Sequence, residues 1–361
     1  MAEETTQDSA TINPILENIY QQPEELHRVL NDLTTERLET VKEVARLANL
    51  AGEIVLTSMG SALYSLMPMY EALLDRGMRN VTLVETAELI HHPERVSKHA
   101  LYILMSRSGE SREVADFSVW LTEHGYTSVA ITMTPTSTMG QHCTVMLHDI
   151  ASYDKIVCIK AYSSMALCGL FVAHMMDHDE PDPTYVARLH AAFDWMEENK
   201  KNWLCAIEQI PFLSSADSFY MLSRAQGINM MRSASLWLEE TAKVPANVMS
   251  LDNFYHGPME LIRAQKITKS KTVPVLLDVL GDDRSRMIWN YITQAQPENI
   301  YIGPAGSDMN ATVYVELPDL ELDGAHMMLV QALYFQLLSY QCAIANNIDP
   351  GMFFEEGWIV Q

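Results

Sequence analysis

The chain has 361 residues, of which 48% are hydrophobic, and a formal net charge of −23. This length is sufficient for two ordinary domains with sizeable cores. The negative charge argues against nucleic acid or an anionic membrane as the main partner, although a local cluster of donors can still bind an anion. The five cysteines are scattered without a Cys-x-x-Cys pair, so we expect neither a disulfide framework nor a metal site.

The N-terminal residues are acidic and polar and resemble neither a signal peptide nor a transit peptide. We therefore expect a cytoplasmic protein in which residues 1–12 are disordered. Apolar positions near helical spacing predict helix over 13–50. We place a partly helical N-terminal extension at residues 1–45. The longest apolar stretch, 165–176, is too short to span a bilayer.

From residue 53 onward, short apolar segments alternate with helical patterns. The predicted strands are 54–60, 81–85, 101–105, 128–133 and 143–148, with helices over 62–74 and from 161. Strands that alternate with helices indicate βαβ units and a parallel sheet. We place a first domain at residues 46–190.

A charged helical stretch over 185–209 leads into a second series of the same kind. Its predicted strands are 218–222, 273–277, 299–302 and 311–315. The helix predicted over 326–345 is apolar on more than one face, which is typical of a buried helix. The expected fold is therefore α/β with two similar lobes, the second at 205–345, followed by a tail at 346–361 near the active site. A ligand is expected where the lobes face each other at the strand C-termini.

Three hydroxyls crowd the turn between the predicted strand 101–105 and the helical stretch that follows. They are Ser106, Ser108 and Ser111, and Gly109 opens the turn. The N-terminus of a helix offers unpaired N–H groups and the positive end of a dipole, so this turn suits a phosphate group. An ordinary serine-capped helix is the alternative interpretation.

In combination, these segments resemble the sugar isomerase (SIS) family, in particular the isomerase half of glucosamine-6-phosphate synthases and the stand-alone fructosamine-6-phosphate deglycases. Segment 57–61 stands where the family has its first glycine turn, and 106–111 matches its phosphate-binding signature. Segments 160–162, 223–226 and 255–258 resemble further family elements. The resemblance covers residue 13 to the C-terminus, and the substrate-binding residues that it implies are Gly60, Ser61, Ser106, Ser108, Ser111, Lys160 and Arg224.

Two adjacent carboxylates, Glu239 and Glu240, end the helical stretch that starts near Met231. Neighbours on a helix point about 100° apart, so the two cannot share a role. Glu240 precedes His256 by the separation that the family shows between its base glutamate and the histidine of His-Gly-Pro. The resemblance thus implies Glu240 as the general base and His256 as the group that opens the sugar ring or protonates a departing amine. A pair of solvated surface glutamates is the alternative.

Two positions depart from the synthase pattern, because Trp237 and Glu356 stand where the synthases carry lysines. Trp237 can line a pocket for an alkyl chain or be ordinary packing. Glu356 can pair with an amine, which suits a sugar joined to an amino acid better than a plain sugar phosphate.

We therefore expect a deglycase that cleaves a 6-phosphorylated sugar–amine adduct, such as fructoselysine or glucoselysine 6-phosphate, to a hexose 6-phosphate and a free amine. No cofactor or metal is expected. The expected assembly is a homodimer with shared active sites, because His256 often comes from a neighbouring subunit in related enzymes. The alternatives are an amino-sugar-phosphate isomerase or deaminase acting on glucosamine 6-phosphate and, ranked last, a non-catalytic sugar-phosphate-binding regulator.

Overall fold

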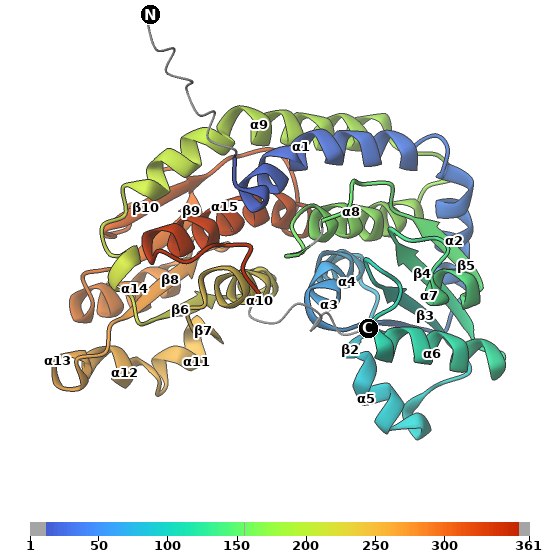
Figure 1. Ribbon diagram of the computed structural model, residues 1–361, viewed down its shortest axis with the longest axis horizontal. Helices are drawn as coiled ribbons and strands as arrows, with labels where there is room; N and C mark the ends of the chain where they lie inside the picture. The colour runs from blue at the N-terminus through green and yellow to red at the C-terminus, as the bar shows by residue number, and fades with distance from the viewer. Residues whose placement is uncertain (1–11, 155, 354–361) are drawn as a thin grey trace, which may run out of the picture.

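Two lobes lie side by side, each built on a five-stranded parallel sheet (Figure 1). The computed structural model describes residues 12–154 and 156–353 of the chain. The first sheet has the strand order β2-β1-β3-β4-β5, and the second has the order β10-β9-β8-β6-β7. Followed from β7, the second sheet repeats the order of the first. The structure confirms the predicted α/β fold with two similar lobes.

The strands of the first lobe are β1 (Glu53–Ser58), β2 (Val81–Glu85), β3 (Ala100–Met105), β4 (Thr127–Thr132) and β5 (Val145–His148). Its helices are α3 (Gly60–Ser65), α4 (Met67–Asp75), α5 (Thr86–His91), η1 (Pro93–Arg95), α6 (Arg112–Glu123), α7 (Thr138–His142) and α8 (Lys160–Met175). Strand β3 is buried along its whole length, because it lies in the middle of the sheet with helices on both faces.

The strands of the second lobe are β6 (Ser218–Ser223), β7 (Ala246–Ser250), β8 (Thr272–Leu277), β9 (Ile300–Pro304) and β10 (Val313–Leu317). Its helical segments are η2 (Leu213–Ser215), α10 (Gly227–Trp237), η3 (Leu238–Ala242), α11 (Leu251–Tyr255), α12 (Met259–Arg263), α13 (Gln265–Thr268), α14 (Asp283–Ala295) and α15 (Gly324–Ala345). Segment η3 is a single π-helical turn.

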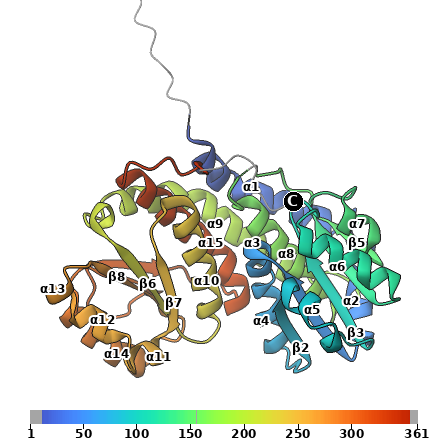
Figure 2. The ribbon, with the colours of Figure 1, turned by 60° about the horizontal axis from the view of Figure 1, so that its bottom comes forward.

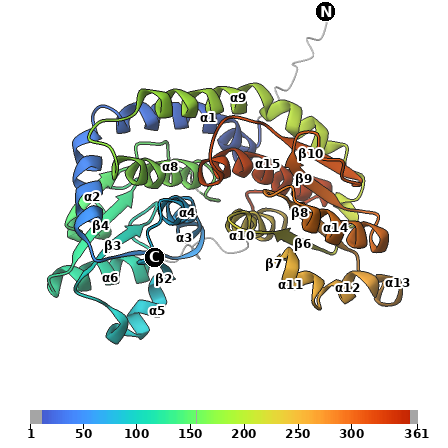
Figure 3. The ribbon, with the colours of Figure 1, turned by 180° about the vertical axis from the view of Figure 1, so that it is seen from behind.

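Helices α1 (Pro14–Leu33), α2 (Leu38–Leu50) and α9 (Pro183–Glu208) complete the described chain. Helix α9 runs along the outside of both lobes, and α1 lies beside it over α8 (Figure 3). Because α1 contacts both α8 and α15, the N-terminal segment joins the lobes. The prediction of one helix over 13–50 is corrected here, since the helix breaks at Thr34–Arg37, where two threonine hydroxyls bond to the carbonyl of Asn31.

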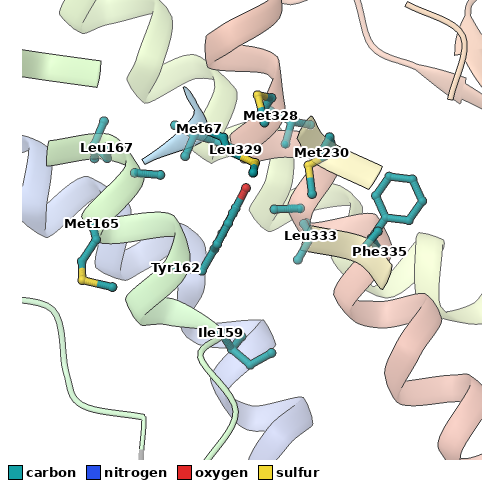
Figure 4. Close-up of a cluster of buried hydrophobic side chains, with 14 of the residues drawn as sticks. Met67, Ile159, Tyr162, Met165, Leu167, Met230, Met328, Leu329, Leu333 and Phe335 are labelled. Atoms are coloured by element: carbon teal, nitrogen blue, oxygen red, sulfur yellow. The ribbon is translucent and has the colours of Figure 1, made fainter. Parts of the chain in front are cut away.

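A shared core joins the lobes, because helices α8 and α15 are buried on nearly every side. Figure 4 shows side chains of α4, α8, α10 and α15 packed in one cluster, among them Met67, Tyr162, Met230 and Leu333. Helix α15 is long and apolar enough to cross a membrane by length and composition alone, but 83% of its most apolar window is buried inside the protein. Its composition is therefore that of a core helix.

Helices α3 and α10 face each other at the lobe junction, each directly after the first strand of its lobe (Figure 2). The predicted helix over 62–74 is two helices, because Pro68 lies in the first turn of α4 and α3 ends at Ser65 before it. Strand β7 was not predicted. It is an edge strand whose residues are only partly buried, so it lacks the continuous apolar run that identified the other strands.

Candidate active site

The loop between β3 and α6 carries the three predicted serines at the C-terminal edge of the first sheet. Ser106 Oγ accepts a hydrogen bond from the Gly109 amide at 3.0 Å and lies 3.4 Å from Ser111 Oγ. Ser108 Oγ accepts from the Glu110 amide at 3.2 Å. Ser111 is the N-cap of α6, yet its side chain makes no capping bond. The first turn of α6 therefore keeps amide groups for an anion.

Gly109 allows this loop to fold tightly. Its φ is +65°, and a Cβ at this position would overlap the side-chain hydroxyl of Ser137. Only glycine combines that backbone conformation with that closeness. The loop also lies at the point in the strand order where β1 and β3 diverge, which is where open α/β sheets usually bind ligands.

Arg107, inside the serine loop, is partly buried against the segment that leads into α8. Its guanidinium donates to the carbonyls of Asp154 at 2.5 Å and Ile156 at 3.1 Å, and lies 5.0 Å from the ring centre of Tyr153. These contacts fix the serine loop against the segment that leads into α8. They also direct a positive charge toward the lobe junction.

Glu240 lies on the π-helical turn η3, which continues α10 from the second lobe. Burial raises the pKa of the Glu240 carboxyl to about 7, against the opposing charges of Arg107 and Lys243. The proton of a carboxyl group in this range can be given and taken near neutral pH. Single π-turns inside helices occur frequently at functional sites.

The adjacent Glu239 has a different environment, as expected for neighbours on a helix, which point about 100° apart. Its side chain is exposed, and Oε1 accepts a hydrogen bond from the Ala246 amide at 3.2 Å. Glu239 therefore ties η3 to β7, whereas the carboxyl group of Glu240 is left near Arg107.

The glycine turn after β1 reaches the same junction. Gly60 has a φ of +55° and starts α3. The pKa of the Cys158 thiol is raised by burial, while Arg107 and a hydrogen bond with Ser61 lower it. The charge of Glu240 also acts on this thiol. The structure thus brings Ser61, Cys158, the serine loop and Glu240 together.

Two of the predicted substrate-binding residues lie in the protein interior. Trp237 is 1% exposed, and its Nε1 donates to the Cys158 carbonyl at 3.2 Å, which favours the packing interpretation over a pocket for an alkyl chain. Lys160 is 4% exposed, and its Nζ donates to Gln21 Oε1 at 2.8 Å and to Ser152 Oγ at 2.7 Å. Both residues support the walls of the site rather than presenting a free surface to a ligand.

Two other predicted residues lie elsewhere in the second lobe, outside the group around Glu240. Arg224 pairs with Asp252 at 2.8 Å and with Asp282 at 2.6 Å, so carboxylates of its own lobe already neutralise it. His256 is exposed at the end of α11. Glu356 lies outside the described residues.

Sequence reasoning missed Arg107, Cys158 and Lys243. Arg107 stands inside the serine motif, and Lys243 is the next charged residue after Glu240, so proximity along the chain was a usable signal for both. No such signal existed for Cys158, because its place near Glu240 and Arg107 follows only from the fold.

The chain has relatives among proteins of known activity, although no family model matches it. It is 23% identical over 346 residues to glutamine–fructose-6-phosphate aminotransferase (isomerizing) of Pyrobaculum aerophilum, covering 93% of this chain and 55% of that protein. The protein of the same name from Halalkalibacterium halodurans is 25% identical over 189 residues, covering 49% of this chain and 30% of that protein. The chain thus spans about half the length of these curated relatives, or less.

Solved structures share the whole fold. The C-terminal domain of glucosamine-fructose-6-phosphate aminotransferase from Francisella tularensis has a TM-score of 0.78 at 16% identity, covering 94% of this chain and 98% of that one. Glucosamine-6-phosphate deaminase from Thermotoga maritima scores 0.75 at 18% identity, covering 94% and 96%. Tagatose-6-phosphate ketose/aldose isomerase from Escherichia coli scores 0.75 at 16% identity, covering 99% and 100%. Together with the sequence relatives, these likenesses confirm the resemblance to the SIS family.

Proposed function

We propose that this protein is an enzyme that moves a proton on an open-chain sugar phosphate, with Glu240 as the general base. The observation that carries the proposal is the place of Glu240, at the lobe junction and within the field of Arg107 from the serine loop. A carboxyl group with a pKa near 7 can take a proton from carbon and return it to the neighbouring carbon.

The serine loop is the proposed phosphate site. The hydroxyls of Ser106, Ser108 and Ser111 and the amide groups that start α6 supply donors, and hydrogen bonds to a phosphate are charge-assisted. The positive end of the α6 dipole adds to the attraction. A phosphate held here would anchor one end of the sugar while the other end reaches toward Glu240.

Within this chemistry we propose a deglycase acting on a 6-phosphorylated sugar–amine adduct, such as fructoselysine or glucoselysine 6-phosphate. Glu240 would shift a proton between C1 and C2 and so convert the adduct to a Schiff base. Water adds to the C=N bond, the C–N bond breaks, and the amine leaves with the proton that His256 supplies, together with a hexose 6-phosphate. No cofactor enters this balance.

An isomerase or deaminase acting on glucosamine 6-phosphate is the second candidate. One observation favours it: Lys243 places a positive charge near the base, so the site keeps a cation although Trp237 and Glu356 replace two lysines of the synthase pattern. The deglycase remains the first proposal, because an acidic residue at position 356 suits a sugar joined to an amino acid better than a plain sugar phosphate.

A substrate panel separates these candidates. The pure protein would be incubated with fructoselysine 6-phosphate, glucoselysine 6-phosphate, glucosamine 6-phosphate and fructose 6-phosphate, while released amine and interconverted sugar phosphates are measured. Release of lysine supports the deglycase, and turnover of glucosamine 6-phosphate alone supports the second candidate. Binding of sugar phosphates without turnover of any substrate would instead favour a regulator.

We also propose a homodimer with shared sites, because His256 is exposed and lies outside the group around Glu240 of its own chain. Two inactive variants, Glu240→Gln and His256→Ala, should then regain partial activity when they are mixed and their subunits exchange. Continued inactivity after demonstrated exchange would assign both residues to one chain or remove the role of His256.

A further inference from the structure

Lys243 occupies an unusual position directly after the π-turn that carries Glu240. Its backbone is left-handed, with a φ of +57°, a conformation that is unfavourable for a residue with a side chain. Its half-buried side chain folds back, and Nζ donates a hydrogen bond to the backbone carbonyl of Glu240. The ring of Phe353, from the C-terminal segment, lies 4.9 Å from the same ammonium group.

The ammonium group of Lys243 is therefore held in place from two sides. A cation over an aromatic face is attracted by the ring, and more strongly when both are partly desolvated. Burial lowers the pKa of Lys243 below its ordinary value, although the carboxylates of Glu240 and Asp349 oppose that effect. Keeping the Lys243 ammonium group charged in this partly buried position near Glu240 therefore costs free energy.

We propose that Lys243 is a positioning residue for the reaction, whose ammonium group is held by the Glu240 carbonyl and the Phe353 ring and keeps the Glu240 carboxylate charged. The inference rests on the proposed function, because it takes Glu240 as the base. It names a role for a residue that does not need to touch the substrate.

Within residues 12–154 and 156–353, charges from several elements act on the pair. Arg107 of the serine loop and Lys243 favour the charged form of Glu240, whereas Glu239 on the same turn opposes it. Asp349, after α15, faces Lys243. The uncharged neighbours Tyr64 on α3 and Cys158 before α8 also lie within the field of the carboxylate.

A purely structural role is the competing explanation, since lysines near helix ends commonly bond to the last carbonyl groups and stabilise the helix. Such a role predicts loss of stability without a change in how Glu240 titrates. The two explanations therefore differ in a measurable quantity, the pH at which the Glu240 carboxyl ionises.

The test compares Lys243→Met, Lys243→Arg and the wild type. The Glu240 carboxyl would be titrated directly by carbon NMR on protein labelled at glutamate carboxyl groups, with its resonance identified by its absence from Glu240→Gln. Loss of the ammonium group should move the titration of Glu240 toward alkaline pH by about one unit, whereas arginine should leave it nearly in place. The acid limb of kcat/KM should move by the same amount, so that activity falls about tenfold on the acid limb and recovers above pH 9.

Lys269→Met is the matched control. Lys269 has the same left-handed backbone, with a φ of +59°, and also ends a helix, but it is exposed in the second lobe. Its removal should leave both the Glu240 titration and the pH profile unchanged.

The proposal is overturned if the titration of Glu240 is unchanged in folded Lys243→Met. If that variant does not fold, the proposal is overturned when Lys243→Arg shifts the Glu240 titration by as much as one pH unit. The NMR result does not depend on turnover. Failure of the proposed function would appear separately, as full activity in Glu240→Gln.

Discussion

The two lobes share one framework but differ in what they place at the same turn. Each has the same strand order, and each has a left-handed glycine in the loop after the third strand of that order: Gly109 after β3 and Gly281 after β8. In the first lobe the loop carries Ser106, Ser108 and Ser111. In the second lobe the same turn carries Asp278, Asp282 and Asp283.

Asp278 shows what this difference does. Its Oδ1 accepts hydrogen bonds from the amide groups of Gly281 at 3.0 Å and Leu280 at 3.2 Å, whereas Ser106 Oγ accepts from the Gly109 amide and lies beside the Ser111 hydroxyl. In the second lobe the carboxylate of Asp278 thus already occupies these backbone amide donors. An external anion would meet these negative charges, which is why we propose a phosphate site in the first lobe and not in the second.

The second lobe contributes the base instead. Helix α10 follows β6 as α3 follows β1, but α10 continues into the π-turn that carries Glu240 to the junction. One lobe therefore supplies the proposed anion site and the other the proposed proton shuttle. Two lobes with the same strand order thus contribute different parts of one proposed site.

The sharpest test of this division is Glu240→Gln. The change keeps the volume and hydrogen-bonding capacity of the side chain but removes the base, so activity should fall about 10²–10⁴-fold. Substrate affinity should be retained. The melting temperature at pH 8 should be at least that of the wild type, because burial penalises the charged carboxylate.

The exposed neighbour provides the control for that variant. Glu239→Gln should lose far less activity, since its carboxylate bonds to the Ala246 amide outside the proposed path of the proton. In heavy water the wild type should also place solvent deuterium at C1 or C2 of the released hexose phosphate. Full activity in Glu240→Gln would remove the proton-shuttle role from the second lobe.

The paired glycines test whether the first-lobe loop is the more constrained one. Gly109→Ala should destabilise the protein by about 2–5 kcal/mol, because left-handed strain adds to the overlap with Ser137. Gly281→Ala should cost only about 1–2 kcal/mol, since the nearest atom to the new Cβ is Pro304 Cγ at 3.8 Å. Urea unfolding of both variants measures the two values, and equal losses would contradict the comparison.

A smaller effect is expected from a serine of the proposed phosphate site. Ser108→Ala should weaken the binding of a phosphorylated substrate by roughly 1–3 kcal/mol, because a charge-assisted hydrogen bond is lost. Leu280→Ala, at the matching position of the second lobe, should leave binding unchanged. Calorimetric titration of both variants with a sugar phosphate checks this, and unphosphorylated adducts should be poor substrates of the wild type. Equal turnover of phosphorylated and free sugars would remove the phosphate assignment.

Much of this division could be predicted from the sequence, because buried strands in a parallel sheet leave continuous apolar runs such as that of β3. The serine turn and Glu240 carried their own local patterns. The roles of Arg107 and Lys243 could not be predicted, since the sequence alone does not show which group a charged side chain will contact. The burial of Trp237 was equally hidden, because an aromatic residue on an apolar helix fits a pocket wall or a core.

The smallest expected effect is the dependence of kcat/KM on pH. Measured in the wild type and in one variant, it distinguishes the contribution of the first lobe from that of the second. Because burial raises the pKa of Glu240 to about 7, its carboxylate is the main form above that pH and is lost as the pH falls. The kcat/KM of the wild type should then fall about tenfold per pH unit below 7, since only the carboxylate accepts a proton. In Ser108→Ala the same acid limb should persist at a lower overall level, because the serine loop contributes binding and Glu240 contributes the titration. An acid limb near pH 4.5 in the wild type would show that the base is a solvated carboxylate, and the second lobe would then lose the role assigned to it here.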